Sequence, residues 1–149
     1  MKISIGADHA AYDLKAVIIE HLNKKGIEVI DRGTYSKDSC DYPDFGISVA
    51  EDVAKKIVDR GIVICYTGIG ISIAANKVKG VRCALVGSVD AAILTREHND
   101  SNCLAMGAKY TPNELAIQIV DTWLGTDFSN MEKHQRRIDK ITGYEGKVE

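Results

Sequence analysis

Five short apolar segments, separated by stretches with a helical pattern, constrain the fold of this chain more than any other feature. They are rich in β-branched residues and cover residues 2–6, 27–31, 62–66, 81–86 and 103–107. Each is almost continuously apolar, as strands are when helices cover both faces of their sheet. The pattern therefore predicts an α/β fold, with a doubly wound, Rossmann-like sheet of five parallel strands and helices on both faces.

The segments between these strands carry the apolar periodicity of amphipathic helices. Residues 10–25 place apolar side chains on one face, and Gly26 follows as a typical stop signal. Residues 44–60 repeat this pattern and end before Gly61. We therefore expect a helix in each of these two crossovers.

Two capping signals predict helices in the last third of the chain. Thr111 and Ser129 are each followed three residues later by a glutamate, which is the spacing of a capping box. They predict a helix that ends at Leu124 and a C-terminal helix that ends near Thr142. Because the chain has no internal repeat and no flexible linker, we expect residues 1–149 to form one domain.

Composition argues against several classes of partner. The chain has 19 Lys and Arg against 21 Asp and Glu, so no overall basic excess indicates a nucleic-acid partner. Its apolar stretches are far shorter than the roughly 20 residues that cross a bilayer, so we expect no membrane segment. No CxxC pair occurs among the cysteines, which are Cys40, Cys65, Cys83 and Cys103. They indicate reduced thiols in a cytoplasmic protein, with Cys83 and Cys103 in apolar strands of the core.

Polar residues follow several of the predicted strands. In a doubly wound sheet, ligands bind beyond the carboxyl ends of the strands. The residues at those ends are Asp8, His9, Cys65, Thr67, Ser88 and Asp90. His98 and Asn99 end the helix before the fifth strand, and they would reach the same edge only if that helix end folds back.

The sequence CYTGIGIS at 65–72 is the strongest local signal. Gly68 and Gly70 let the backbone approach a ligand, and the N–H groups of a helix that starts near Ser72 favour an anion. The segment lacks the spacing of a Walker motif and of a dinucleotide fingerprint, so an ordinary strand-to-helix turn explains it equally well. Cys65 precedes the helix start, where N–H groups stabilise a thiolate, but a buried core cysteine also fits this position.

Two further arrangements could bind a ligand. Lys133 and Arg137 lie four residues apart on one helix face, where they either clamp a phosphate or form a solvated basic surface. Cys65, His9 and His98 are metal-ligating residue types, but no short spacing supports a metal site.

Taken together, these segments resemble ribose-5-phosphate isomerase type B, of the family that also includes galactose-6-phosphate isomerase subunits. The resemblance covers nearly the whole chain and preserves the order of the family's motifs. These motifs are GADHAAYDLK at 6–15, DYPDF at 41–45, CYTGIGISIAANK at 65–77, REHNDSN at 96–102 and KHQRRIDKI at 133–141.

The resemblance implies an isomerase that converts ribose 5-phosphate to ribulose 5-phosphate through a cis-enediolate, without a metal or organic cofactor. Cys65 matches the base that moves the proton, with Thr67 beside it, and His98 matches the residue that opens the sugar ring. Asp8 matches the residue that shuttles protons among hydroxyls. The implied substrate-binding residues are His9, Tyr42, Tyr66, Gly68, Ile69, Gly70, Ile71, Ser72, Asn99, Lys109, Lys133 and Arg137.

The same resemblance implies a homodimer, or a dimer of dimers, whose active sites are shared between subunits. Many family members carry Arg where this chain has Lys109 and Lys133, and a lysine lacks the planar fork of a guanidinium. Two other functions stay open. One is an isomerase of a hexose 6-phosphate such as allose or galactose 6-phosphate, and the other is a sugar-phosphate sensor without catalysis.

Overall fold

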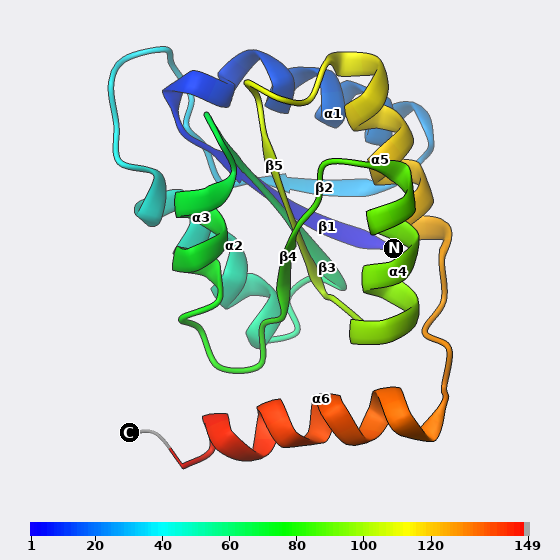
Figure 1. Cartoon of the computed structure of the whole chain (residues 1–149). Helices are drawn as coiled ribbons and strands as arrows, with labels where there is room; N and C mark the ends of the chain where they lie inside the picture. The colour runs from blue at the N-terminus through cyan, green and yellow to red at the C-terminus, as the bar shows by residue number, and fades with distance from the viewer. Residues whose placement is uncertain (148–149) are drawn as a thin grey trace.

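Five parallel strands form one sheet in the computed structural model, in the order β2-β1-β3-β5-β4 (Figure 1). The structure describes residues 1–147, so residues 148–149 of the expected domain lie outside the described part. The strands are β1 (Lys2–Ala7), β2 (Glu28–Asp31), β3 (Arg60–Cys65), β4 (Cys83–Leu85) and β5 (Cys103–Gly107). All five expected strands are therefore confirmed, and the parallel sheet with them.

Helices cover both faces of this sheet (Figure 1). A short 3-10 helix, η1 (His9–Ala11), precedes the others, which are α1 (Tyr12–Lys24), α2 (Tyr42–Ala54), α3 (Ile69–Ala75), α4 (Val89–Asn99), α5 (Asn113–Gly125) and α6 (Glu132–Glu145). Helices α1, α4 and α5 contribute buried residues to the core on one face, and α2 and α3 to the core on the other. Helix α6 contacts α4 and lies along one end of the molecule.

Successive side chains of the central strands point to opposite faces of the sheet, so each strand contributes residues to both cores. Ile62 and Ile64 of β3 face the first core, whereas Val63 and Cys65 face the second, and all four are buried. Burying one such aliphatic side chain contributes about 1.5–3 kcal/mol. Because β3 lies between β1 and β5, its carboxyl end is held on both sides. Cys65 therefore occupies a well-fixed position at the end of the most central strand.

The predicted end of the second helix is wrong. Helix α2 stops at Ala54 rather than at residue 60, because Lys56 adopts a left-handed φ of 60°. The amides of Lys56 and Ile57 turn back onto carbonyls of α2, and the N–H of Asp59 then donates to the carbonyl of Lys2. Pairing with β1 thus begins where the apolar periodicity still favoured a helix.

Neither expected capping box forms. Helix α5 has Pro112 as its cap residue, and the Thr111 hydroxyl is buried without a hydrogen-bond partner among the described residues. Helix α6 has Met131 as its cap residue, and the Ser129 hydroxyl instead contacts the ring of His134. Cys83 is also only half-buried rather than a core residue, because β4 is an edge strand.

Candidate functional site

Asp8 and Cys65 lie side by side at the carboxyl edge of the sheet. Strands β1 and β3 pair through Ala7 and Ile64, and the N–H of Asp8 donates to the carbonyl of Ile64 over 3.2 Å. The Asp8 carboxylate is almost fully buried and accepts the N–H of Ala10 at 3.1 Å, which caps η1. A buried carboxylate and a thiol are therefore held next to each other, as the carboxyl-end rule predicts.

The thiol of Cys65 is bound by the backbone that follows it. The N–H of Gly68 donates to its sulfur over 3.2 Å, and the residue is only 4% exposed. Gly68 has a φ of +79°, and a Cβ there would lie 2.7 Å from the carbonyl carbon of Met106. Only glycine fits this turn, which directs the Gly68 N–H at the sulfur.

Helix α3 begins directly after this turn, at Ile69 rather than near Ser72 as the sequence suggested. The N–H groups of Gly70 and Ile71 have no acceptor in the described part of the chain, as is usual in a first helical turn. Tyr42 covers this turn so closely that its ring would collide with a Cβ at Gly70. The first turn of α3 thus offers two donors under an aromatic side chain.

Two of the expected phosphate ligands lie at the same edge. The Nδ1 atom of His9 accepts the N–H of Cys40 at 3.2 Å, so the neutral His9 ring carries its hydrogen on Nε2 and can donate it to an anion. The N–H of Lys109 donates to the carbonyl of Tyr66 over 2.8 Å, and the Lys109 ammonium lies 5.5 Å from the centre of the Tyr66 ring. Both Lys109 and Tyr66 are exposed.

His98, Asn99, Lys133 and Arg137 are absent from this edge, whereas Ser88 lies at it. Helix α4 runs back from it, and at about 1.5 Å per residue His98 lies roughly 14 Å from the helix start. Asp100 then adopts a left-handed φ of 44° and leads the chain into β5, so the helix end does not fold back toward Cys65. Ser88 caps α4 by accepting the N–H of Ala91, which gives it a structural role.

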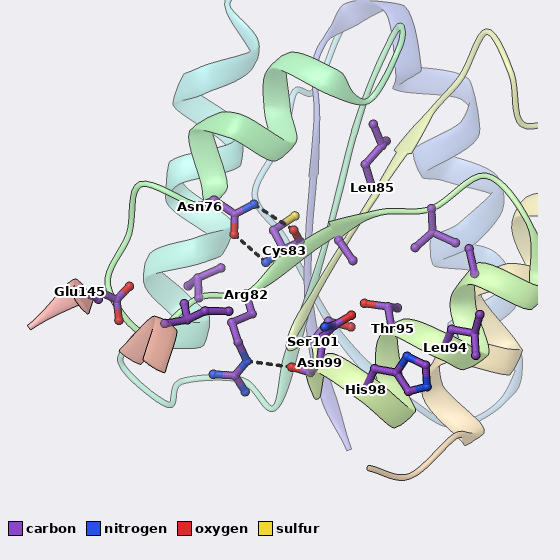
Figure 2. Close-up of a pocket in the computed structure, with 15 residues that line it drawn as sticks. Asn76, Arg82, Cys83, Leu85, Leu94, Thr95, His98, Asn99, Ser101 and Glu145 are labelled. Atoms are coloured by element: carbon purple, nitrogen blue, oxygen red, sulfur yellow. Dashed lines mark hydrogen bonds between the residues drawn. The ribbon is translucent and has the colours of Figure 1, made fainter. Parts of the chain in front are cut away.

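His98 and Asn99 lie instead beside a groove of about 680 Å³ between β4, α4 and α6. Figure 2 shows both residues at the end of α4, with Arg82 donating to the carbonyl of Asn99. This groove is larger than the hollow of about 270 Å³ beside Thr67 at the carboxyl edge. Cavity size does not identify the candidate catalytic residues here, because the buried Asp8 and the Cys65 thiol lie outside the larger groove.

Helix α6 brings a second group of cations next to His98. Lys133 and Arg137 are exposed, whereas His134 between them is buried. The ring centres of His98 and His134 are 4.3 Å apart, with an angle of 37° between the planes. Burial lowers the pKa of His134, and His98, Lys133 and Arg137 lower it further, while Glu97 opposes them. Sequence reasoning missed His134, although its spacing of four from the buried Ile138 marks the inner face of α6.

The predicted residues therefore form two clusters. The carboxyl-edge cluster consists of Asp8, His9, Tyr42, Cys65, Tyr66, Thr67, Gly68, Ile69, Gly70, Ile71, Ser72 and Lys109. The α4–α6 cluster consists of His98, Asn99, Lys133, His134 and Arg137. Because His98 belongs to the second cluster, Cys65, His9 and His98 do not form a metal site in one chain.

Within residues 1–147, no three Cys, His, Asp or Glu side chains come together as metal ligands. The described helices include none that is both long and apolar enough to cross a membrane.

Comparison with known proteins gives one consistent family. The family model described as Ribose/Galactose Isomerase matches residues 3–141. The chain is 47% identical to ribose-5-phosphate isomerase B of Escherichia coli, over 97% of this chain and 96% of that protein. It is 44% identical to ribose-5-phosphate isomerase B of Mycobacterium tuberculosis, over 97% of this chain and 90% of that protein.

Solved structures agree with these sequence relatives. Ribose-5-phosphate isomerase B of Clostridium thermocellum superposes with a TM-score of 0.97 at 52% identity, over 99% of both chains. The enzyme of Mycoplasma genitalium with bound ribulose 5-phosphate superposes with a TM-score of 0.94 at 44% identity, over 99% of this chain and 97% of that one.

Proposed function

The chain belongs to the ribose/galactose isomerase family, and from this premise we propose that it is an enzyme that interconverts ribose 5-phosphate and ribulose 5-phosphate. The observation that carries the proposal is similarity over nearly the full length to proteins named ribose-5-phosphate isomerase B. The reaction is an internal oxidation and reduction, in which the C1 aldehyde becomes an alcohol and the C2 alcohol becomes a ketone. No outside oxidant or reductant is required.

Cys65 is the proposed base of the proton transfer. Its thiolate takes the proton from C2 of the open-chain aldose, which leaves a cis-enediolate, and returns the proton to C1. The Gly68 N–H on the sulfur supports this role, because it holds the nucleophilic atom in one position at the carboxyl edge. Asp8, which is buried beside Cys65, is proposed to carry the second proton between the O1 and O2 oxygens.

The backbone after Cys65 is proposed to hold the enediolate. The free N–H groups of Gly70 and Ile71 point out of the first turn of α3, where negative charge develops on the sugar oxygen. One such fixed donor typically contributes about 3–4 kcal/mol to the transition state. Tyr42 lies over this turn and is proposed to contact the sugar.

His98 is proposed to open the furanose ring, and Asn99 to contact the sugar. The phosphate is assigned to His9, Lys109, Lys133 and Arg137. Since Lys109 and Lys133 are point charges without a bidentate fork, we expect a less rigid grip on the phosphate than two arginines would give.

We further propose that each active site is shared between two copies of the chain in a homodimer, or in a dimer of dimers. The support is the separation of the two clusters. The base and the enediolate donors lie at one edge, His98 lies roughly 14 Å along α4 from it, and Lys133 and Arg137 lie on α6, which packs against α4. A complete site requires the α4–α6 cluster of one copy to meet the carboxyl-edge cluster of another.

A hexose 6-phosphate is the second candidate substrate, because the matching family model covers galactose as well as ribose isomerases. The test is to measure isomerisation of ribose 5-phosphate and of allose 6-phosphate side by side, with EDTA present. We expect EDTA-resistant turnover with the higher kcat/KM for ribose 5-phosphate. A higher value for the hexose contradicts the pentose assignment, and calorimetric binding without turnover of either sugar indicates a sensor.

A further inference from the structure

His134 is a buried side chain next to the proposed site for which the mechanism above has no role. It lies on α6 between the exposed Lys133 and Arg137, and it is only 5% exposed. Its ring packs against His98 in a tilted arrangement, with the centres 4.3 Å apart, so it is the aromatic neighbour of the residue assigned to ring opening.

A hydrogen bond with Ser129 holds this ring in place. The Ser129 hydroxyl accepts the N–H of Met131 at 3.2 Å, and it lies 2.7 Å from Nδ1 of His134. A hydroxyl has one hydrogen and two lone pairs, so Ser129 either donates to Nδ1 or accepts from it, according to the tautomer of His134. In either case the contact anchors the His134 ring to Ser129.

The surroundings of His134 favour a neutral ring. Burial disfavours a charged ring, and Lys133, Arg137 and any proton on His98 repel one, with Glu97 as the opposing charge. A neutral ring can stack on His98 whether or not His98 carries a proton. A protonated His134 at this distance would oppose the positive charge that a general acid must carry before it donates.

The anchor also connects two helices. The N–H of Ser129 donates to the carbonyl of Glu97 at 3.2 Å, so Ser129 is tied to α4 through its backbone and contacts α6 through its hydroxyl. Glu97 is the residue directly before His98. Movement of His134 would therefore be transmitted to the ring that it covers.

We propose that His134 is a positioning residue for ring opening, an uncharged ring anchored by Ser129 that holds the imidazole of His98 in one orientation. This inference rests on the proposed function, and in particular on the role of His98. It predicts that loss of His134 impairs the opening of the cyclic aldose and leaves proton transfer at C1 unaffected.

The two steps can be separated with ribulose 5-phosphate, whose C5 oxygen carries the phosphate and cannot close a furanose ring. In D2O, NMR follows deuterium entry at C1 of this ketose, which requires proton transfer only. A coupled assay in the same buffer follows the net conversion of ribose 5-phosphate, which requires ring opening as well. The variants are His134→Ala, His134→Phe, Ser129→Ala and His98→Ala.

For His134→Ala we expect net conversion of ribose 5-phosphate to fall about 10- to 100-fold, while exchange at C1 stays within about twofold of the wild-type rate. Ser129→Ala removes the anchor and the acceptor of the Met131 N–H but keeps the His134 ring, so we expect net conversion to fall by less than in His134→Ala while exchange at C1 is again preserved. His134→Phe keeps an uncharged ring over His98 but cannot bond to Ser129, so we expect a loss of net conversion no larger than that of Ser129→Ala. His21→Ala is the matched control, because this partly buried histidine contacts Asp121 through its Nε2 at 2.7 Å and takes no part in the site.

Equal loss of both rates in folded His134→Ala and Ser129→Ala overturns the inference, and so do unchanged rates in both. If His134→Ala does not fold, the same comparison of net conversion with C1 exchange in Ser129→Ala and His134→Phe tests the inference. If net conversion and C1 exchange fall equally in His98→Ala, the premise that His98 opens the ring is wrong. A wild-type chain that neither exchanges nor converts these sugars refutes the proposed function itself.

Discussion

Mixing two inactive variants is the sharpest prediction for the shared site. Cys65 lies in the carboxyl-edge cluster and His98 in the α4–α6 cluster, roughly 14 Å along α4 from that edge. If each site takes Cys65 from one copy and His98 from the other, a mixed dimer of Cys65→Ala and His98→Ala chains has one doubly altered site and one intact site.

Random reassociation makes half of the dimers mixed, and each has one intact site of two, so about one quarter of the wild-type activity returns. The assay is net conversion of ribose 5-phosphate after the two variants are unfolded and refolded together. The matched control pairs Cys65→Ala with Asp8→Ala. Both residues lie at the same edge, so every site in that mixture stays altered and no activity returns.

The refuting result is an absence of recovery in a mixture that does contain mixed dimers. Two different affinity tags, purified in succession, establish that mixed dimers are present. A site contained within one chain leaves both mixtures inactive, because each site then keeps one substitution.

Three further predictions concern single substitutions. Gly68→Ala places an L residue at φ +79°, which alone costs about 1–2 kcal/mol of stability. It also places a Cβ 2.7 Å from the carbonyl carbon of Met106, so we expect the free energy of unfolding to fall by clearly more than that. Gly26→Ala, at φ +74° with open space around it, measures the φ cost by itself, and equal losses in urea denaturation contradict the clash. Ser101→Ala leaves the buried Nε1–H of Trp123 without its 2.9 Å acceptor, which should lower the free energy of unfolding by about 1–3 kcal/mol; an unchanged urea midpoint refutes this. At Asp121, burial acts to raise the carboxyl pKa, but hydrogen bonds from Lys25 and His21 lower it overall, so the ion pairs stabilise the fold above the ordinary pKa of 3.8. Asp121→Asn should therefore be less stable than the wild type at neutral pH, with the difference disappearing as the pH falls through the lowered pKa, whereas a difference that persists in acid contradicts this origin.

The sheet could be predicted from the sequence because its signals are local. The segment 103–107 is apolar throughout and became β5 with the expected bounds, since a central strand buried on both faces needs only apolar residues. The position of Cys65 followed in the same way, as the last residue of an apolar run before two glycines. The strand rule put Asp8 at the same edge of the sheet, but that Asp8 lies beside Cys65 follows only from the pairing of β1 with β3 in the structure.

Other features depended on tertiary contacts that no local pattern contains. Ser129 had the spacing of a helix cap, but its hydroxyl contacts a histidine on the following helix. Helix α2 ended early because the chain pairs with Lys2, a residue distant in sequence. His98 and Asn99 were expected near Cys65 only if a helix end folded back, and the left-handed Asp100 sends the chain into β5 instead.

The most direct test of the central claim is the exchange of the C1 proton of ribulose 5-phosphate in D2O, measured by NMR for the wild type and for Cys65→Ala. Cys83→Ala is the control, because it removes a half-buried thiol outside both clusters. With Cys65 as the base, we expect rapid exchange in the wild type and in Cys83→Ala, and a loss of about 100- to 10,000-fold in a folded Cys65→Ala variant. Exchange at the wild-type rate without the Cys65 thiol would contradict the account.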